Sequence, residues 1–124
     1  MHVERICRLN DQLTEHVIGA AIEVHRLLES IYEEALCVEL QLRGIAFERQ
    51  VSIDVLYKGH IIKGQRLDLL VEGQVVVELK SQAKSPETAI AQVLSYLKAT
   101  GMRRGLLINF GLPRLRDGLK RISL

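Results

Sequence analysis

Apolar residues recur every three or four positions over the first third of the chain, the spacing of one helix face. The stripe is made of Leu13, Val17, Ala20, Val24, Leu27, Ile31, Ala35, Val38 and Leu42. Asn10 or Asp11 can cap the start of the helix, and Gly44 can end it. The pattern therefore predicts one long helix from Asn10 to Arg43.

Such a helix would be about 50 Å long, whereas a compact domain of this size is roughly 35 Å across. Either the helix bends between Arg26 and Ser30, or its overhanging end packs on a second copy of the chain. The segment from Arg26 to Ser30 contains neither glycine nor proline. The sequence therefore favours a homodimer, with helices exchanged between subunits as one form of it.

After Gly44 the apolar period changes to that of strands. Three strands are expected, at Phe47–Leu56, Ile61–Val71 and Gln74–Ser81. A second helix follows, in which Ser85 caps the start, Pro86 takes the first turn and Thr100 is the last residue. A buried fourth strand covers Gly105–Phe110, and from Pro113 on a strand and a helical turn are both compatible with the pattern. The order α-β-β-β-α-β predicts an α/β fold, a mixed sheet flanked by helices.

Composition and charge narrow the class of protein. A length of 124 residues suits one domain, 1–124. No apolar run approaches the ~18 residues of a membrane span, and the first residues do not resemble a signal peptide, so we expect a cytoplasmic protein without a membrane partner. Residues 98–124 carry seven Lys and Arg against one acid, whereas residues 1–97 carry ten against fourteen. A basic end beside an acidic site suits a polyanion such as nucleic acid; charge alone is equally compatible with a solvated tail.

The candidate chemistry lies in Asp68, Glu78 and Lys80, spaced as D-x9-E-x-K. A three-residue loop at 72–74 would pair Asp68 directly with Glu78 on one face of a hairpin, whereas a two-residue loop would separate them. A bulge near Asp68 would also bring them together. Opposed carboxylates need a cation, and we predict the pairing register. Hard oxygen ligands suit Mg²⁺ or Mn²⁺, so Asp68, Glu78 and the carbonyl of Leu79 are the expected metal ligands. Lys80 could orient a water or stabilise negative charge on a phosphodiester.

Helical residues extend this candidate site. Gln92 and Tyr96 are four apart and share one helix face, from which Gln92 could reach Lys80 or a phosphate oxygen. Among the acids of the long helix, Glu29 and Glu33 lie on one face, and one of them could add a further oxygen to the metal. The histidines show no ligand spacing.

The chain resembles the GxxExxY proteins, a branch of the PD-(D/E)xK nuclease superfamily with RecB-like features. The resemblance rests on the segments 18–26, 29–36, 47–50, 57–59, 66–71, 78–80, 105–110 and 120–122. It implies Asp68, Glu78 and Lys80 as the core catalytic residues, with Gln92 and Tyr96 as a RecB-like extension. Glu29 and Tyr32 match the Glu and Tyr of the naming motif. Family members carry a short Gly-Pro-Gly-type turn before this motif; it is missing here, and Arg26 stands in place of its glycine.

Three functions are compatible with these features. The combination of Asp68, Glu78 and Lys80 favours a metal-dependent nuclease that acts on DNA. The missing turn and the modest net charge of +2 favour an inactive nucleic-acid-binding or assembly module with the same fold. In the third, the chain is a structural dimer with the long helix as its functional surface.

Overall fold

The computed structural model describes residues 2–3, 11–27, 31–83 and 87–124. Its elements are β1 (His2–Val3), α1 (Asp11–Leu27), α2 (Tyr32–Leu42), β2 (Phe47–Tyr57), β3 (His60–Val71), β4 (Val75–Lys80), α3 (Glu87–Thr100), β5 (Arg104–Asn109), the 3-10 helix η1 (Leu115–Gly118) and β6 (Leu119–Ser123). The predicted α/β class is confirmed, and the predicted α-β-β-β-α-β order is found from α2 to β5.

The strands form one mixed sheet in the order β1-β6-β5-β4-β3-β2. β4 and β5 are parallel, and the other neighbours are antiparallel. Parallel neighbours need a crossover connection, and α3 provides it. β4 lies inside the sheet, and Val75, Val76 and Val77 are fully buried, as three consecutive valines predict.

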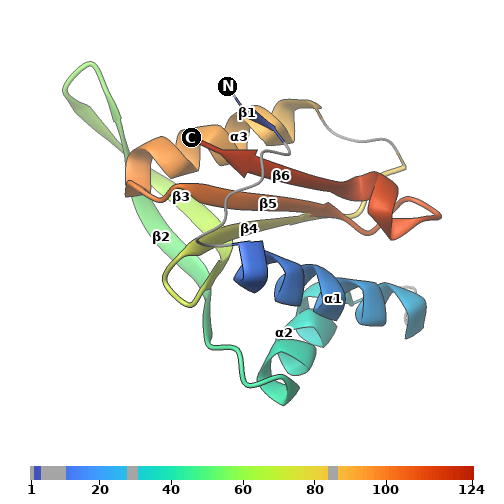
Figure 1. Ribbon diagram of the computed structural model, residues 1–124. Coiled ribbons are helices and arrows are strands. Elements are labelled where there is room, and N and C mark those ends of the chain that lie inside the picture. The colour runs from blue at the N-terminus through green and yellow to red at the C-terminus, as the bar shows by residue number, and fades with distance from the viewer. Residues whose placement is uncertain (1, 4–10, 28–30, 84–86) are drawn as a thin grey trace.

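Helices cover both faces of the sheet (Figure 1), with α1 and α2 on one side and α3 on the other. The core under α1 and α2 contains Val17, Leu36, Leu40, Val77 and Ile108, among other residues. The core under α3 contains Leu67, Val76, Val93, Leu97 and Ile122, among other residues. Each face of the sheet therefore has its own apolar layer.

The prediction of one continuous N-terminal helix is wrong. α1 ends at Leu27, α2 begins at Tyr32, and Ile31 before α2 has a left-handed backbone with φ 52°. A left-handed residue cannot lie inside a right-handed helix. The break needs no glycine because tertiary contacts hold α2, in which Leu36 and Leu40 are fully buried.

The burial of α2 shows that its apolar face is not a continuation of the α1 stripe. In α1 the predicted positions Val17, Ala20 and Val24 are buried. In α2, however, the stripe residues Val38 and Leu42 are 54% and 77% exposed. The overhanging helix that favoured a helix-exchanged dimer is therefore not present in the described residues.

The remaining differences between the predicted and the observed elements concern the two ends of the chain and the start of α3. The C-terminal segment contains both alternatives expected after Pro113, the turn η1 and the strand β6. The short strand β1, which pairs with β6, was not predicted. Ser85 and Pro86, predicted to start α3, lie outside the described residues. Within those residues, no helix has the length and apolarity required to span a bilayer.

Candidate active site

The β3–β4 hairpin has the predicted register. Val71 pairs with Val75, Leu70 with Val76 and Leu69 with Val77, across the loop 72–74. Extending this register by one residue sets Asp68 opposite Glu78. The two residues are in contact, because the backbone N–H of Asp68 donates to Oε1 of Glu78 at 3.4 Å.

In β3 the regular alternation of side chains between the two sheet faces is interrupted at Asp68. Residues two apart normally share a sheet face, yet Leu67 packs in the core under α3 and Leu69 in the core under α1 and α2. Gln50, at the same level of β2, has a left-handed φ of 50°. At this irregularity the Asp68 carboxylate reaches β4, where its Oδ2 accepts a hydrogen bond from the Leu79 N–H at 2.8 Å.

Glu78 is a buried carboxyl group, with 3% of the residue exposed. The pKa of Glu78 is raised to about 7, mainly by burial and then by the nearby charge of Asp68, while the ammonium group of Lys80 acts in the opposite direction. Lys80 lies two residues along β4, and its Nζ is 3.7 Å from Oε2 of Glu78. Asp68, Glu78 and Lys80 are therefore brought together, as the spacing predicts.

Gln92 and Tyr96 lie on α3, the helix that covers this face of the sheet. The amide of Gln92 donates a hydrogen bond to the Tyr96 hydroxyl at 2.8 Å. Tyr96 is 3% exposed. Burial raises the pKa of Tyr96, and the negative charge of Glu78 raises it too. The hydrogen bond from Gln92 lowers this pKa. Tyr96 is therefore close enough to Glu78 for the two groups to interact electrostatically, and Gln92 is connected to Glu78 through Tyr96.

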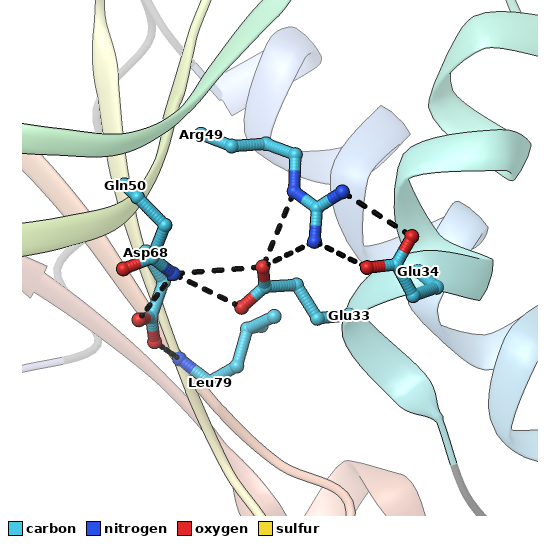
Figure 2. Close-up of polar contacts among 6 residues, drawn as sticks. All are labelled: Glu33, Glu34, Arg49, Gln50, Asp68 and Leu79. Atoms are coloured by element: carbon cyan, nitrogen blue, oxygen red, sulfur yellow. Dashed lines mark hydrogen bonds and ion pairs between the residues drawn. The ribbon is translucent and has the colours of Figure 1, made fainter.

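An acidic group on α2 approaches the site from the other side of the sheet (Figure 2). The guanidinium group of Arg49 binds Glu33 at 2.6 Å and Glu34 at 2.7 Å. The amide of Gln50 lies 3.3 Å from Glu33 and 3.5 Å from Oδ1 of Asp68. Glu33 is therefore linked to Asp68 through one side chain.

Glu29, the helix acid selected from the sequence, lies outside the described residues. Arg49 and Gln50 were not predicted as site residues. The available signal was the register of β2 with β3, in which Arg49 pairs with Leu69 and Val51 with Leu67. That register places Gln50 opposite Asp68, but it depends on a bulge between Ile53 and Val55 that loop length alone does not define.

Asn109 is a further residue that sequence reasoning missed. Its side chain is fully buried at the end of β5. Its Oδ1 accepts hydrogen bonds from the N–H groups of Gln82 and Gly111, at 2.9 and 3.0 Å, and its Nδ2 donates to the Gln82 carbonyl at 3.0 Å. The Phe110 N–H also donates to the Lys80 carbonyl at 2.8 Å. The chain is thereby fixed on both sides of Ser81, directly after Lys80.

The donor set at this site fits a hard divalent cation. Two carboxylates meet at Asp68 and Glu78, and a cation between them would favour the ionised form of Glu78, which burial disfavours. In the described part of the chain, no group of three or more His, Cys, Asp or Glu side chains is arranged to hold a metal. Further oxygen ligands would come from the backbone, from water or from a residue outside that part.

Comparison with known proteins agrees with this geometry. A sequence profile of the PD-(D/E)XK nuclease superfamily matches residues 11–122. The chain belongs to this superfamily. No curated protein matches the chain.

A solved structure described as "Crystal structure of SSO0001" has a similar fold, with a TM-score of 0.53 and 19% sequence identity. The match covers 94% of this chain and 59% of the other. The chain thus spans less than two thirds of that protein, and the similarity supports the fold alone.

Proposed function

We propose that the protein is a metal-dependent nuclease of the GxxExxY branch that hydrolyses DNA phosphodiester bonds. The meeting of Asp68 and Glu78 across the β3–β4 hairpin, with Lys80 3.7 Å from Glu78, is the observation that carries the proposal. The two carboxylates and the carbonyl oxygen of Leu79 would hold Mg²⁺ or Mn²⁺. Glu29 is the further acid that the resemblance implies.

The residues around the metal would divide the chemistry between them. When bound, the cation would offset the charge of the scissile phosphate and lower the pKa of the attacking water. Lys80 would orient that water or stabilise the developing negative charge. The Tyr96 hydroxyl accepts a hydrogen bond from Gln92, so its own O–H group can donate to a phosphate oxygen.

Cleavage of plasmid and single-stranded DNA with Mg²⁺ or Mn²⁺ tests this function. We expect Lys80→Ala to lower the cleavage rate by about 10²–10³-fold, the loss typical for one stabilising donor. Lys63→Ala is the matched control, since Lys63 is exposed on β3 outside the site. Equal rates for wild type and Lys80→Ala would refute the role of Lys80.

A metal-binding readout separates the site from its activity. A cation held by the folded protein at a hundred times its Kd stabilises it by about 2.7 kcal/mol. We expect Mn²⁺ to raise the thermal unfolding temperature of wild type and of Asp54→Asn, in which an exposed acid of β2 is removed. Asp68→Asn and Glu78→Gln should lose this response.

The alternative function is a catalytically inactive module that binds nucleic acid. The ion pairs of Arg49 with Glu33 and Glu34 favour it, because they already neutralise Glu33, the α2 acid that Gln50 links to Asp68. In that case wild type and Lys80→Ala would both be inert, yet both would bind DNA in a salt-dependent way.

A homodimer is part of the proposal and is independent of the catalytic function. Val38 and Leu42 lie four apart on α2 and are both largely exposed, which supports an apolar contact between subunits. Light scattering should give the mass of two chains for wild type and a lower mass for Val38→Lys. A monomeric wild type would exclude the dimer.

A further inference from the structure

A cleft begins beside Lys80 and continues past the loops that follow β4 and β5. Its first part has a volume of about 470 Å³ and is bordered by Glu33, Leu79 and Lys80, among others. Its second part, of about 600 Å³, extends to His25, Gln82 and Pro113. Both parts share the wall residues Tyr32, Ser81 and Phe110, so the two hollows lie next to each other.

The shared wall is aromatic. The rings of Tyr32 and Phe110 stack with centroids 4.3 Å apart and an angle of 6° between their planes. The ring of His25 also stacks on Phe110, with 6.4 Å between the two ring centroids. Phe110 is 2% exposed, whereas Tyr32 and His25 are half-buried. Tyr32 is therefore the ring that a ligand in the cleft can reach next to Lys80.

The wall is also rigid. The ring of His25 contacts the Leu112 carbonyl through Nε2 at 3.1 Å, and a carbonyl oxygen only accepts, so Nε2 must carry the hydrogen. Asn109 fixes Gln82, which also lines the cleft. A Cβ atom at Gly111 would lie 2.4 Å from the Gln82 backbone, so these loops pack without a gap. A preformed cavity of this size fits a ligand as large as a nucleotide.

We propose that this cleft binds the substrate strand and that an unpaired base stacks on Tyr32 next to the catalytic centre. The inference rests on the proposed nuclease function and specifies its substrate as single-stranded nucleic acid. Bases in a duplex are stacked on each other, so only an unpaired base can use an aromatic wall. The cleft is assigned to the substrate because Lys80, a proposed catalytic residue, lines its first part.

Binding can be measured without cleavage in the Asp68→Asn background. The probes are a fluorescein-labelled 12-nucleotide DNA strand, the same strand with abasic sites at its six central positions, and the corresponding duplex. We expect the intact strand to bind at least tenfold tighter than the abasic strand, because each stacked base contributes about that much affinity. The duplex should bind more weakly than the intact strand.

Variants of Tyr32 show whether the wall causes this preference. Tyr32→Leu should reduce the difference between intact and abasic strands to within about twofold, and Tyr32→Phe should preserve it. Tyr57→Leu is the matched control, since Tyr57 is 58% exposed and lies outside the cleft. The chain contains no tryptophan, so Tyr32→Trp supplies a unique fluorophore that a stacked base should quench.

The outcomes separate the cleft from the nuclease function. Equal binding of intact and abasic strands by the Asp68→Asn protein, or tighter binding of the duplex, would overturn the cleft assignment. So would a Tyr32→Leu protein that folds and keeps the full preference. A Tyr32-dependent preference in a protein that never cleaves DNA would retain the cleft and refute the nuclease.

Discussion

Glu78 shows how one side chain connects the fold to the proposed chemistry. It lies on β4 between the two cores, follows three buried valines, and is itself 3% exposed. A charged carboxylate is unfavourable there unless a cation compensates it. Lys80 compensates in part from 3.7 Å, while Asp68 adds charge of the same sign. A site that penalises its own ionised form in this way gains stability when a divalent cation binds.

The raised pKa of Glu78 predicts how stability depends on pH without metal. Its pKa is about 7 in the folded state against an ordinary value of 4.5, so the folded protein binds more protons between these values. Stability should therefore fall as pH rises from about 4.5 to about 7. At 1.36 kcal/mol per pKa unit, the loss is roughly 3 kcal/mol.

Urea unfolding in EDTA, at pH values from 4.5 to 8, measures this dependence. Glu78→Gln cannot ionise, so its stability should lack this component of the decrease. Glu48→Gln, which removes an exposed acid from β2, should follow wild type. A Glu78→Gln protein with the full wild-type dependence would show that Glu78 does not titrate abnormally.

The site residues differ in how far the sequence determines them. Asp68, Glu78 and Lys80 could be predicted because strand period and loop length define which of them meet. Gln50 could not, because its approach to Asp68 needs a left-handed backbone and a bulge in β2. The role of Asn109 could not either, since its partner Gln82 is 27 residues away.

Among the elements, α1 and α2 show the limit of reading a helix from its apolar period. The apolar spacing from Leu13 to Leu42 is continuous. The helix is nevertheless interrupted before α2, where Ile31 has a left-handed backbone, and Val38 and Leu42 face solvent. Tertiary contacts decide the break: Tyr32 stacks on Phe110, and Arg49 of β2 binds Glu33 and Glu34. Such contacts involve residues far along the chain, so local periodicity does not reveal them.

The strands after the break were easier to predict, because alternation and turn residues are local signals. Even so, β1 consists of two residues that pair only with β6, and no pattern of that length can be recognised. The short elements at the sheet edge thus depend on the assembled sheet.

The connection between β4 and β5 predicts a large effect from one buried side chain. Asn109→Ala would leave three backbone groups of Gln82 and Gly111 without their side-chain partner. Because each intramolecular hydrogen bond contributes about 0.5–1.5 kcal/mol net, the loss of all three should lower the free energy of unfolding by roughly 2–4 kcal/mol. Chemical denaturation measures it.

Thr100→Val is the matched control for Asn109→Ala. The Thr100 hydroxyl also bonds to backbone groups, donating to the Tyr96 carbonyl and accepting from the Met102 N–H. Thr100, however, lies before the start of β5, whereas Asn109 lies at its end. Its loss should cost about 1 kcal/mol and leave cleavage unchanged, whereas Asn109→Ala should slow cleavage by releasing the segment after Lys80. Similar effects on stability and cleavage from both variants would contradict a specific role for Asn109.

At the scale of the whole molecule, the fold distributes the basic C-terminal segment over two ends of the sheet. Arg104 pairs in register with Val75, and Asn109 with Lys80, so the start of β5 lies away from the site and its end lies beside it. Lys98 and Arg103 are exposed near the start. Arg114 and Arg116, which follow β5, are exposed near the end.

Only the second pair is therefore placed to contact a strand in the cleft, whose wall reaches Pro113. The charge count of the sequence correctly identifies a basic segment, but it treats both pairs alike. The difference between them arises from the parallel pairing of β4 and β5, a property of the assembled sheet.

Two double variants with the same change in charge test this difference. For Arg114→Gln with Arg116→Gln, we expect weaker DNA binding and a log Kd–log salt slope reduced by about 1.4, since each phosphate contact to a single strand contributes about 0.7. For Lys98→Gln with Arg103→Gln, the slope should stay near that of wild type. Fluorescence anisotropy between 50 and 200 mM salt, again in the Asp68→Asn background, gives both slopes. Equal reductions would mean that the protein attracts DNA through its net charge, and that the path of the strand is not defined by the end of β5.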